Sequence, residues 1–182
     1  MLRPLVPRDA RELLDVIAAS RAELGAYMNW PREMVSIEHA RRFVALGRDG
    51  WLAERTARFG MFERASGALV GSVEIEGIDT RRRQAELGYW VRTDHAGLGV
   101  ATEAARSALL YAFQTLALHK VRADVAVGNH SSARVLEKLG FMLEGTLRED
   151  RLIGGTFCDH WRHGLLSREF NERYGLPEAA ST

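Results

Sequence analysis

Several features are scarce in this sequence, and each absence excludes a class of protein. The 182 residues include one cysteine, Cys158, which cannot form an intrachain disulfide and offers no framework for a zinc site. The longest apolar helix-like run, residues 107–119, is shorter than the ~20 residues that cross a bilayer. Charged residues interrupt the N-terminus from Arg3 to Glu12, so no signal region is expected there. We therefore expect a cytoplasmic protein.

An excess of either charge is also lacking. The 25 Lys and Arg residues nearly balance 24 acids, and a general partner of nucleic acid or membrane surfaces usually carries a larger basic excess. What is present is 46% hydrophobic and 27% charged residues, which is typical of a globular chain. The length favours one domain over residues 1–175, followed by a frayed tail over 176–182.

Hydrophobic periodicity predicts an α/β (α+β) fold in which hairpins precede and follow a strand–helix–strand–helix segment. The expected order is a strand over 1–6, a helix opened by Asp9, a helix from Ser36 to near Gly47–Gly50, a hairpin turning at Ser66–Gly67, a central strand over 85–91, a helix over 101–116, a strand over 121–127, a helix over 131–139, and a final hairpin of 141–147 with 156–165.

A glycine-containing loop lies between the central strand and the next helix. Gly97 and Gly99 allow close approach of a ligand to the backbone, and free N–H groups at a helix start can bind an anion such as a pyrophosphate. Taken alone, such a turn is structural about as often as it binds phosphate. It is no dinucleotide fingerprint, because Thr102 replaces the third glycine, and no P-loop lysine follows.

Four stretches carry a resemblance to a known family. They are Asn29–Pro31, Ala85–Val91, Gly97–Ala104, and Asn129–Phe141 continuing into Leu143–Gly145. In this order and spacing they resemble the GNAT superfamily of N-acetyltransferases, specifically its RimJ/RimL branch of ribosomal-protein N-terminal acetyltransferases. The resemblance implies a single mixed, mostly antiparallel sheet flanked by helices, with acetyl-CoA as co-substrate.

The resemblance also assigns the cofactor contacts. The backbone amides of the loop would hold the pyrophosphate of acetyl-CoA, the end of the central strand would pair with the pantetheine arm, and an asparagine would anchor the cofactor or acetyl group. The residues so assigned are Val91, Arg92, Gly97, Leu98, Gly99, Val100, Ala101, Thr102 and Asn129. The family's polar residue at the start of the loop is replaced by Ala96, which removes one contact.

Acyl transfer to an amine needs an acid for the departing thiolate. Many superfamily members use a tyrosine, but the aligned position is Leu136, and the RimJ/RimL resemblance assigns the role to Ser132. The alternative is that Asn129, Ser131 and Ser132 only cap the helix that follows them.

Glu86 is the first candidate for a general base, acting through water, because a carboxylate in an otherwise apolar strand is costly unless it is paired or functional. A structural ion pair with Arg82 or Arg83 is the alternative. In relatives an acid of the last hairpin loop has been proposed as base, but Arg151 stands at that position, and Glu149 and Asp150 are the adjacent substitutes. Asp159 is a candidate to bind the incoming amine, and Trp30 either lines the acceptor pocket or belongs to the core.

These residues predict an acetyl-CoA-dependent transferase acting on an α-amine, most simply a protein N-terminus. An α-amine has a pKa of ~8 against ~10.4 for lysine, so a weak base suffices near neutrality. The run Arg81–Arg83 would favour acidic residues further along such an acceptor. The alternatives are acetylation of a small amine, such as an antibiotic or polyamine, and a non-catalytic acyl-CoA-binding module. No metal is expected, and the oligomeric state, including a homodimer, stays open.

Overall fold

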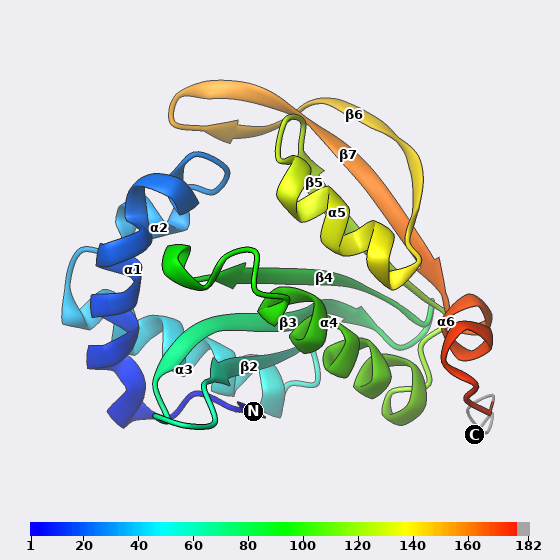
Figure 1. Cartoon of the computed structure of the whole chain (residues 1–182), viewed down its shortest axis with the longest axis horizontal. Helices are drawn as coiled ribbons and strands as arrows, with labels where there is room; N and C mark the ends of the chain where they lie inside the picture. The colour runs from blue at the N-terminus through cyan, green and yellow to red at the C-terminus, as the bar shows by residue number, and fades with distance from the viewer. Residues whose placement is uncertain (178–182) are drawn as a thin grey trace.

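The computed structural model describes residues 1–177, and one seven-stranded sheet runs through them (Figure 1). The strands follow the spatial order β1-β2-β3-β4-β5-β7-β6, and only the β4–β5 pair is parallel. Their bounds are β1 (Leu2–Arg3), β2 (Thr56–Phe62), β3 (Leu69–Asp79), β4 (Gln84–Val91), β5 (Lys120–Ala126), β6 (Met142–Ile153) and β7 (Thr156–Leu166). The expected mixed, mostly antiparallel sheet is confirmed.

Helices cover both faces of this sheet (Figure 1). They are α1 (Ala10–Gly25), α2 (Trp30–Glu33), α3 (Ile37–Leu52), α4 (Val100–Leu110), α5 (His130–Leu139) and α6 (Ser167–Tyr174), with short turns η1 (Pro7–Asp9), η2 (Thr93–His95) and the π-helical η3 (Tyr111–Thr115). Successive side chains of a strand point to opposite faces, so Leu87 packs with α4 and α5 while Trp90 packs with α1 and α3. The sheet therefore separates two apolar clusters.

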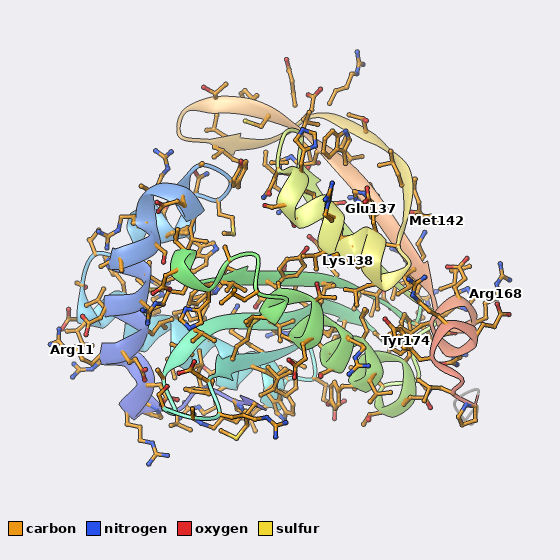
Figure 2. The ribbon with its side chains drawn as sticks, viewed as in Figure 1. Arg11, Glu137, Lys138, Met142, Arg168 and Tyr174 are labelled. Carbon is orange, nitrogen blue, oxygen red and sulfur yellow. The ribbon has the colours of Figure 1, made fainter. Side chains whose placement is uncertain are left out.

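The α5 helix illustrates how the sequence fixes the larger cluster. Leu136 and Leu139 are fully buried beneath it, and Val121 of β5 belongs to the same cluster. Glu137 and Lys138 are exposed on the outer side of the helix (Figure 2). Truncating a fully buried leucine such as Leu136 to alanine typically costs about 2–5 kcal/mol of stability.

Two expected boundaries at the N-terminal side were wrong. The helix expected to stop near Gly47–Gly50 continues to Leu52, because Trp51 packs against Phe59 at a ring-centroid distance of 5.3 Å and stacks on Tyr111 at 5.8 Å. The first strand spans only Leu2–Arg3. The cap expected at Ser36 is confirmed, since its Oγ accepts a hydrogen bond from the His39 N–H.

The chain after β7 also departs from expectation. Helix α6 was not anticipated, and it buries Phe170 against Phe113 of η3. The Leu176 N–H donates to the Asn171 carbonyl, and residues 178–182 of the tail expected over 176–182 lie outside the described residues. Within residues 1–177, no helix combines the length and apolarity needed to cross a membrane.

Candidate active site

The glycine loop projects its backbone outward at the start of α4. Gly97 and Gly99 adopt left-handed φ angles of 79° and 83°, which favour glycine, and a Cβ added at either would meet nothing within 4 Å. Gly99 is the N-cap of α4, so the amides of the first helical turn have no partner inside the helix. Leu98, between the glycines, is exposed. This loop has the geometry of an anion-binding site.

Arg92 and Asp94 lie directly before the loop. The Arg92 Nε donates to Asp94 Oδ1 at 2.7 Å, and His95 Nδ1 lies 2.7 Å from the same oxygen. Hydrogen bonds from Arg92 and His95 lower the pKa of Asp94 to about 2. The Asp94 carboxylate therefore compensates the charge of Arg92 beside the loop, and it fixes the position of the Arg92 guanidinium.

Strands β4 and β5 diverge next to this loop. Their parallel pairing consists of Gln84 with Lys120, Ala85 with Val121, and Glu86 with Arg122. Beyond Glu86, β4 continues to Val91 paired only with β3. The Arg92 N–H is bonded to Val70 of β3, so by alternation the Val91 N–H points to the open side. An extended ligand can pair with this free edge of β4.

Tyr89 and Ser132 connect the two sides of the divergence. The Tyr89 hydroxyl lies 2.9 Å from Ser132 Oγ and 3.0 Å from the Ser132 carbonyl oxygen. Burial raises the pKa of Tyr89 to about 12, against the lowering effect of the Ser132 bond, so the phenol stays protonated. Asn129 caps α5, because its Oδ1 accepts from the Ser132 N–H at 3.2 Å. The capping interpretation therefore holds for Asn129, while the Ser132 hydroxyl has a separate partner.

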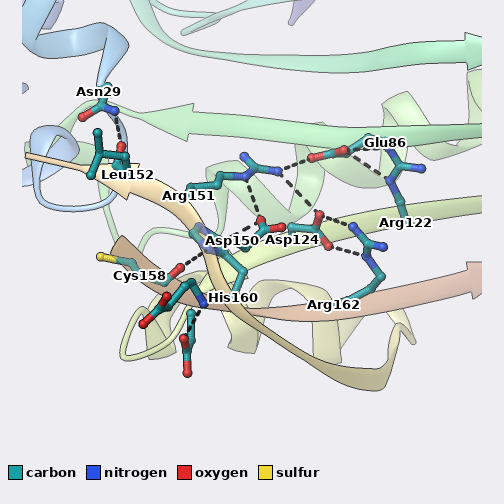
Figure 3. Close-up of polar contacts among 12 residues, drawn as sticks. Asn29, Glu86, Arg122, Asp124, Asp150, Arg151, Leu152, Cys158, His160 and Arg162 are labelled. Carbon is teal, nitrogen blue, oxygen red and sulfur yellow. Dashed lines mark hydrogen bonds and ion pairs between the residues drawn. The ribbon is translucent and has the colours of Figure 1, made fainter. Parts of the chain in front are cut away.

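Glu86 sits in a network of ion pairs at the closed end of the divergence (Figure 3). Its Oε2 accepts from Arg122 at 3.2 Å, and its Oε1 accepts from Arg151 at 3.0 Å. The partners are thus Arg122 and Arg151, whereas Arg82 pairs with Asp79. Both oxygens of Glu86 are engaged, which favours its structural interpretation over its role as a free base.

Arg151 reaches Glu86 because β6 is irregular. The register with β7 shifts between Leu147 and Arg151, and Glu149 has a positive φ of 50° within this bulge. The Glu149 N–H donates to Asp159 Oδ1 at 2.7 Å. The Asp159 carboxylate, expected to bind an amine, therefore stabilises the bulge that directs Arg151 toward β4.

Glu76 faces the same part of the sheet and was not identified from the sequence. It lies opposite Glu86 in the β3–β4 register. Burial, together with the charges of Glu74 and Glu86, raises its pKa to about 7, and Arg58 and Arg151 only partly offset this. A carboxyl group that exchanges its proton near neutrality has the pKa that suits a general base.

Trp30 lies at the start of α2 and packs on the second apolar cluster. Its ring centroid is 5.2 Å from that of Phe43 and 5.9 Å from that of Trp90. It is half-buried, so it contributes to the core and keeps part of its ring accessible. Among residues 1–177, no group of three or more His, Cys, Asp or Glu side chains is arranged to hold a metal ion.

Comparison with known proteins decides the family. The model of the acetyltransferase (GNAT) domain matches residues 1–142. The chain belongs to the GNAT acetyltransferase family. This GNAT protein is an acyltransferase, and the fold expected from the resemblance is confirmed.

Individual relatives support the RimJ/RimL branch. A Bacillus subtilis protein with the provisional name ribosomal N-acetyltransferase YdaF is 30% identical over 171 residues, 93% of this chain and 92% of YdaF. The structure of Mycobacterium smegmatis RimJ with a CoA disulfide has a TM-score of 0.82 and 25% identity, covering 98% of this chain and 90% of RimJ.

A relative with a different kind of acceptor in its name is also similar to this chain. A spermidine N(1)-acetyltransferase of Vibrio cholerae is 35% identical over 111 residues, 61% of this chain and 64% of that protein.

Proposed function

We propose that this GNAT protein transfers an acetyl group from acetyl-CoA to the α-amine of a protein N-terminus. The observation that carries the cofactor assignment is the outward-facing backbone of Gly97–Gly99 at the start of α4, beside the free edge of β4. The likeness to YdaF and RimJ supports the class of acceptor. The proposed compartment is the cytoplasm.

The chain's own groups fit the cofactor in three places. The amides from Leu98 to Thr102 at the start of α4 would bind the pyrophosphate, since they lack partners within the helix. The Val91 backbone would pair with the pantetheine arm, and Asn129 would remain near the acetyl group while capping α5. Bound there, acetyl-CoA supplies an activated acyl group as a thioester.

Ser132 is proposed to donate a proton to the departing thiolate. Its hydroxyl lies on the first turn of α5, beside the diverging strands, and Tyr89 holds it from the side of β4. A neutral α-amine attacks the thioester carbonyl to form a tetrahedral intermediate, and the carbon–sulfur bond breaks as the sulfur takes the Ser132 proton. The surplus proton of the attacking nitrogen passes through water to the Ser132 oxygen, which restores the serine. Because α-amines titrate near pH 8, a fraction is neutral at pH 7, and the compensated Glu86 need not act as a strong base.

A second acceptor class, polyamines, follows from the likeness to the spermidine acetyltransferase over 111 residues. The test supplies acetyl-CoA with peptides bearing free Ser or Ala N-termini, and separately with spermidine and an aminoglycoside, while thiol release is recorded. Acetylation of the peptides supports the proposal. If only the small amines are acetylated, the acceptor is a polyamine or an antibiotic rather than a protein N-terminus. If acetyl-CoA binds but no acceptor causes thiol release, the protein is a non-catalytic acyl-CoA-binding module.

A further inference from the structure

On strands β4–β7, the carboxylates of Glu86 and Asp124 lie deeper than the arginines that pair with them. The carboxylates lie inside, because the Asp124 side chain is 2% exposed and that of Glu86 is 15% exposed. The guanidinium-bearing side chains lie outside them, with exposures of 43% for Arg122, 47% for Arg151 and 35% for Arg162. Figure 3 shows these arginines around the two acids. A molecule that approaches Glu86 and Asp124 therefore meets the guanidinium groups of their arginines first.

The buried carboxylates hold the arginines in fixed positions. Arg162 donates from Nε and Nη2 to Asp124 at 2.9 and 2.8 Å, and Arg122 uses the same two nitrogens toward Glu86. Burial opposes ionisation of Asp124, but the hydrogen bond and charge of Arg162 and the charge of Arg151 outweigh it and lower its pKa. The Nη1 groups of Arg122 and Arg162 are not used in these bonds, so they can donate to a ligand.

A polar pocket of about 200 Å³ lies beside these two arginines. Its lining residues are Gln84, Ala85, Lys120, Arg122, Glu144 and Arg162. Three of the lining side chains are cationic and one is acidic, and that acid, Glu144, accepts hydrogen bonds from Lys120 at 2.6 and 2.8 Å. The pocket therefore presents more positive than negative charge and several donors in a fixed arrangement.

We propose that this pocket binds a carboxylate of the acceptor, so that the enzyme selects amines that carry an acidic group close behind the amine. The pocket lies at the closed end of the β4–β5 divergence, where Gln84 pairs with Lys120. An acceptor extended along this face would place its amine toward the open end and its carboxylate on Arg122 and Arg162. A polyamine would instead bring ammonium groups against guanidinium groups, which is unfavourable. This proposal rests on the proposed function and narrows its substrate class.

Matched peptides test the proposal. A peptide that begins Ser-Asp is compared with one that begins Ser-Asn, and a second pair places Asp or Asn at the third position, with kcat/KM measured for each. We expect the acidic member of at least one pair to have an approximately 5- to 20-fold higher kcat/KM at low salt, as for a charge-assisted contact. This ratio falls as salt screens the interaction.

The Arg122→Gln variant assigns the preference to the pocket. It removes one guanidinium while Glu86 keeps Arg151 as a partner, and we expect the acidic-to-neutral ratio to fall toward one. Arg64→Gln is the matched control, because Arg64 is exposed in the turn between β2 and β3 and its loss changes the net charge equally. Equal kcat/KM within both peptide pairs, or an unchanged ratio in Arg122→Gln, overturns the pocket assignment and leaves N-terminal acetylation intact. If spermidine is acetylated and no peptide is, the proposed function itself fails.

Discussion

The Tyr89 hydroxyl of β4 lies 2.9 Å from the Ser132 Oγ of α5, and it is the contact that ties the candidate acid to the strand proposed to hold the cofactor. The Tyr89 hydroxyl also donates to the Ser132 carbonyl oxygen at 3.0 Å, and in its contact with Ser132 Oγ either hydroxyl can be the donor. In the arrangement in which Tyr89 donates to Ser132 Oγ, the serine proton is free to point toward a sulfur atom. The raised pKa of Tyr89 keeps this donor protonated through neutral and alkaline pH.

Tyr89→Phe removes this donor and keeps the ring. We expect kcat to fall about 10-fold, the effect of one lost hydrogen bond to a reacting group, while the Kd of acetyl-CoA changes less than 2-fold, about 0.4 kcal/mol. Steady-state kinetics and calorimetry measure the two quantities. A structural role alone would instead lower the free energy of unfolding and weaken cofactor binding with little effect on kcat.

Ser132→Ala removes the proposed proton donor itself. The expected loss in kcat is roughly 10- to 1,000-fold, the range for one acid or donor, with acetyl-CoA affinity retained because the loop amides are untouched. Since Tyr89 is proposed to act through Ser132, adding Tyr89→Phe to Ser132→Ala should cost little more. Wild-type turnover in Ser132→Ala would leave this serine as a helix-start residue only.

Gly99→Glu places a side chain and a negative charge at the anion-binding loop. We expect loss of detectable acetyl-CoA binding in calorimetry, because the charge repels a pyrophosphate and the side chain blocks its approach. Gly67→Glu is the matched control, since Gly67 has a similar φ of 74° and open space but lies in the β2–β3 turn. It reproduces the backbone strain of Gly99→Glu without touching the loop, so equal binding by the two variants contradicts the assignment.

The sequence contains most of the fold and only part of the site. The Gly97–Thr102 loop and the helix that ends at Gly140 were predictable, because glycine conformation and hydrophobic periodicity are local properties. The extension of α3 past Gly50 was not, since it depends on Trp51 packing against distant aromatic rings. Tertiary contacts there outweigh the local helix-breaking tendency of glycine.

The ion-pair partners of Glu86 are decided by strand pairing and by the β6 bulge, neither of which is visible in the local sequence. The isolation of Glu86 in an apolar strand predicted a general base first and an ion pair as the alternative, and the arginines nearest in sequence, Arg82 and Arg83, are not its partners. Arg122 lies on the neighbouring strand, and Arg151 arrives only through the β6 bulge. Asp124 is likewise a carboxylate in an apolar strand, between Ala123 and Val125. The same reasoning applied to Asp124 would have predicted a second paired acid in this network.

Glu76 makes stability depend on pH in a defined direction. Its folded pKa of about 7 lies above the ordinary value of 4.5, so between these values the folded protein holds a proton that the unfolded chain has lost. The free energy of unfolding should therefore decrease as pH rises from about 5 to 7, by on the order of 1–2 kcal/mol after allowance for solvent screening. Glu76→Gln should abolish this decrease, and Glu137→Gln, on the exposed side of α5, should keep it. Urea unfolding across pH 5–8 checks both, and identical pH dependence in Glu76→Gln would contradict the raised pKa.

Asn29, which precedes α2, forms hydrogen bonds with the tip of the β6–β7 hairpin. Its Nδ2 donates to the Leu152 carbonyl, and its Oδ1 accepts from the Gly154 N–H at 3.0 Å. In Asn29→Ala both bonds are lost, so the Gly154 amide should exchange with solvent at least about 5-fold faster, while global stability falls by about 1 kcal/mol or less because the site is exposed. Asn29→Asp is the matched control: it keeps the acceptor for Gly154 and removes the donor to Leu152, so protection of the Gly154 amide should persist. Hydrogen exchange read by NMR at Gly154 distinguishes the variants, and unchanged protection in Asn29→Ala would mean that the hairpin is held by its own strand pairing rather than by this contact.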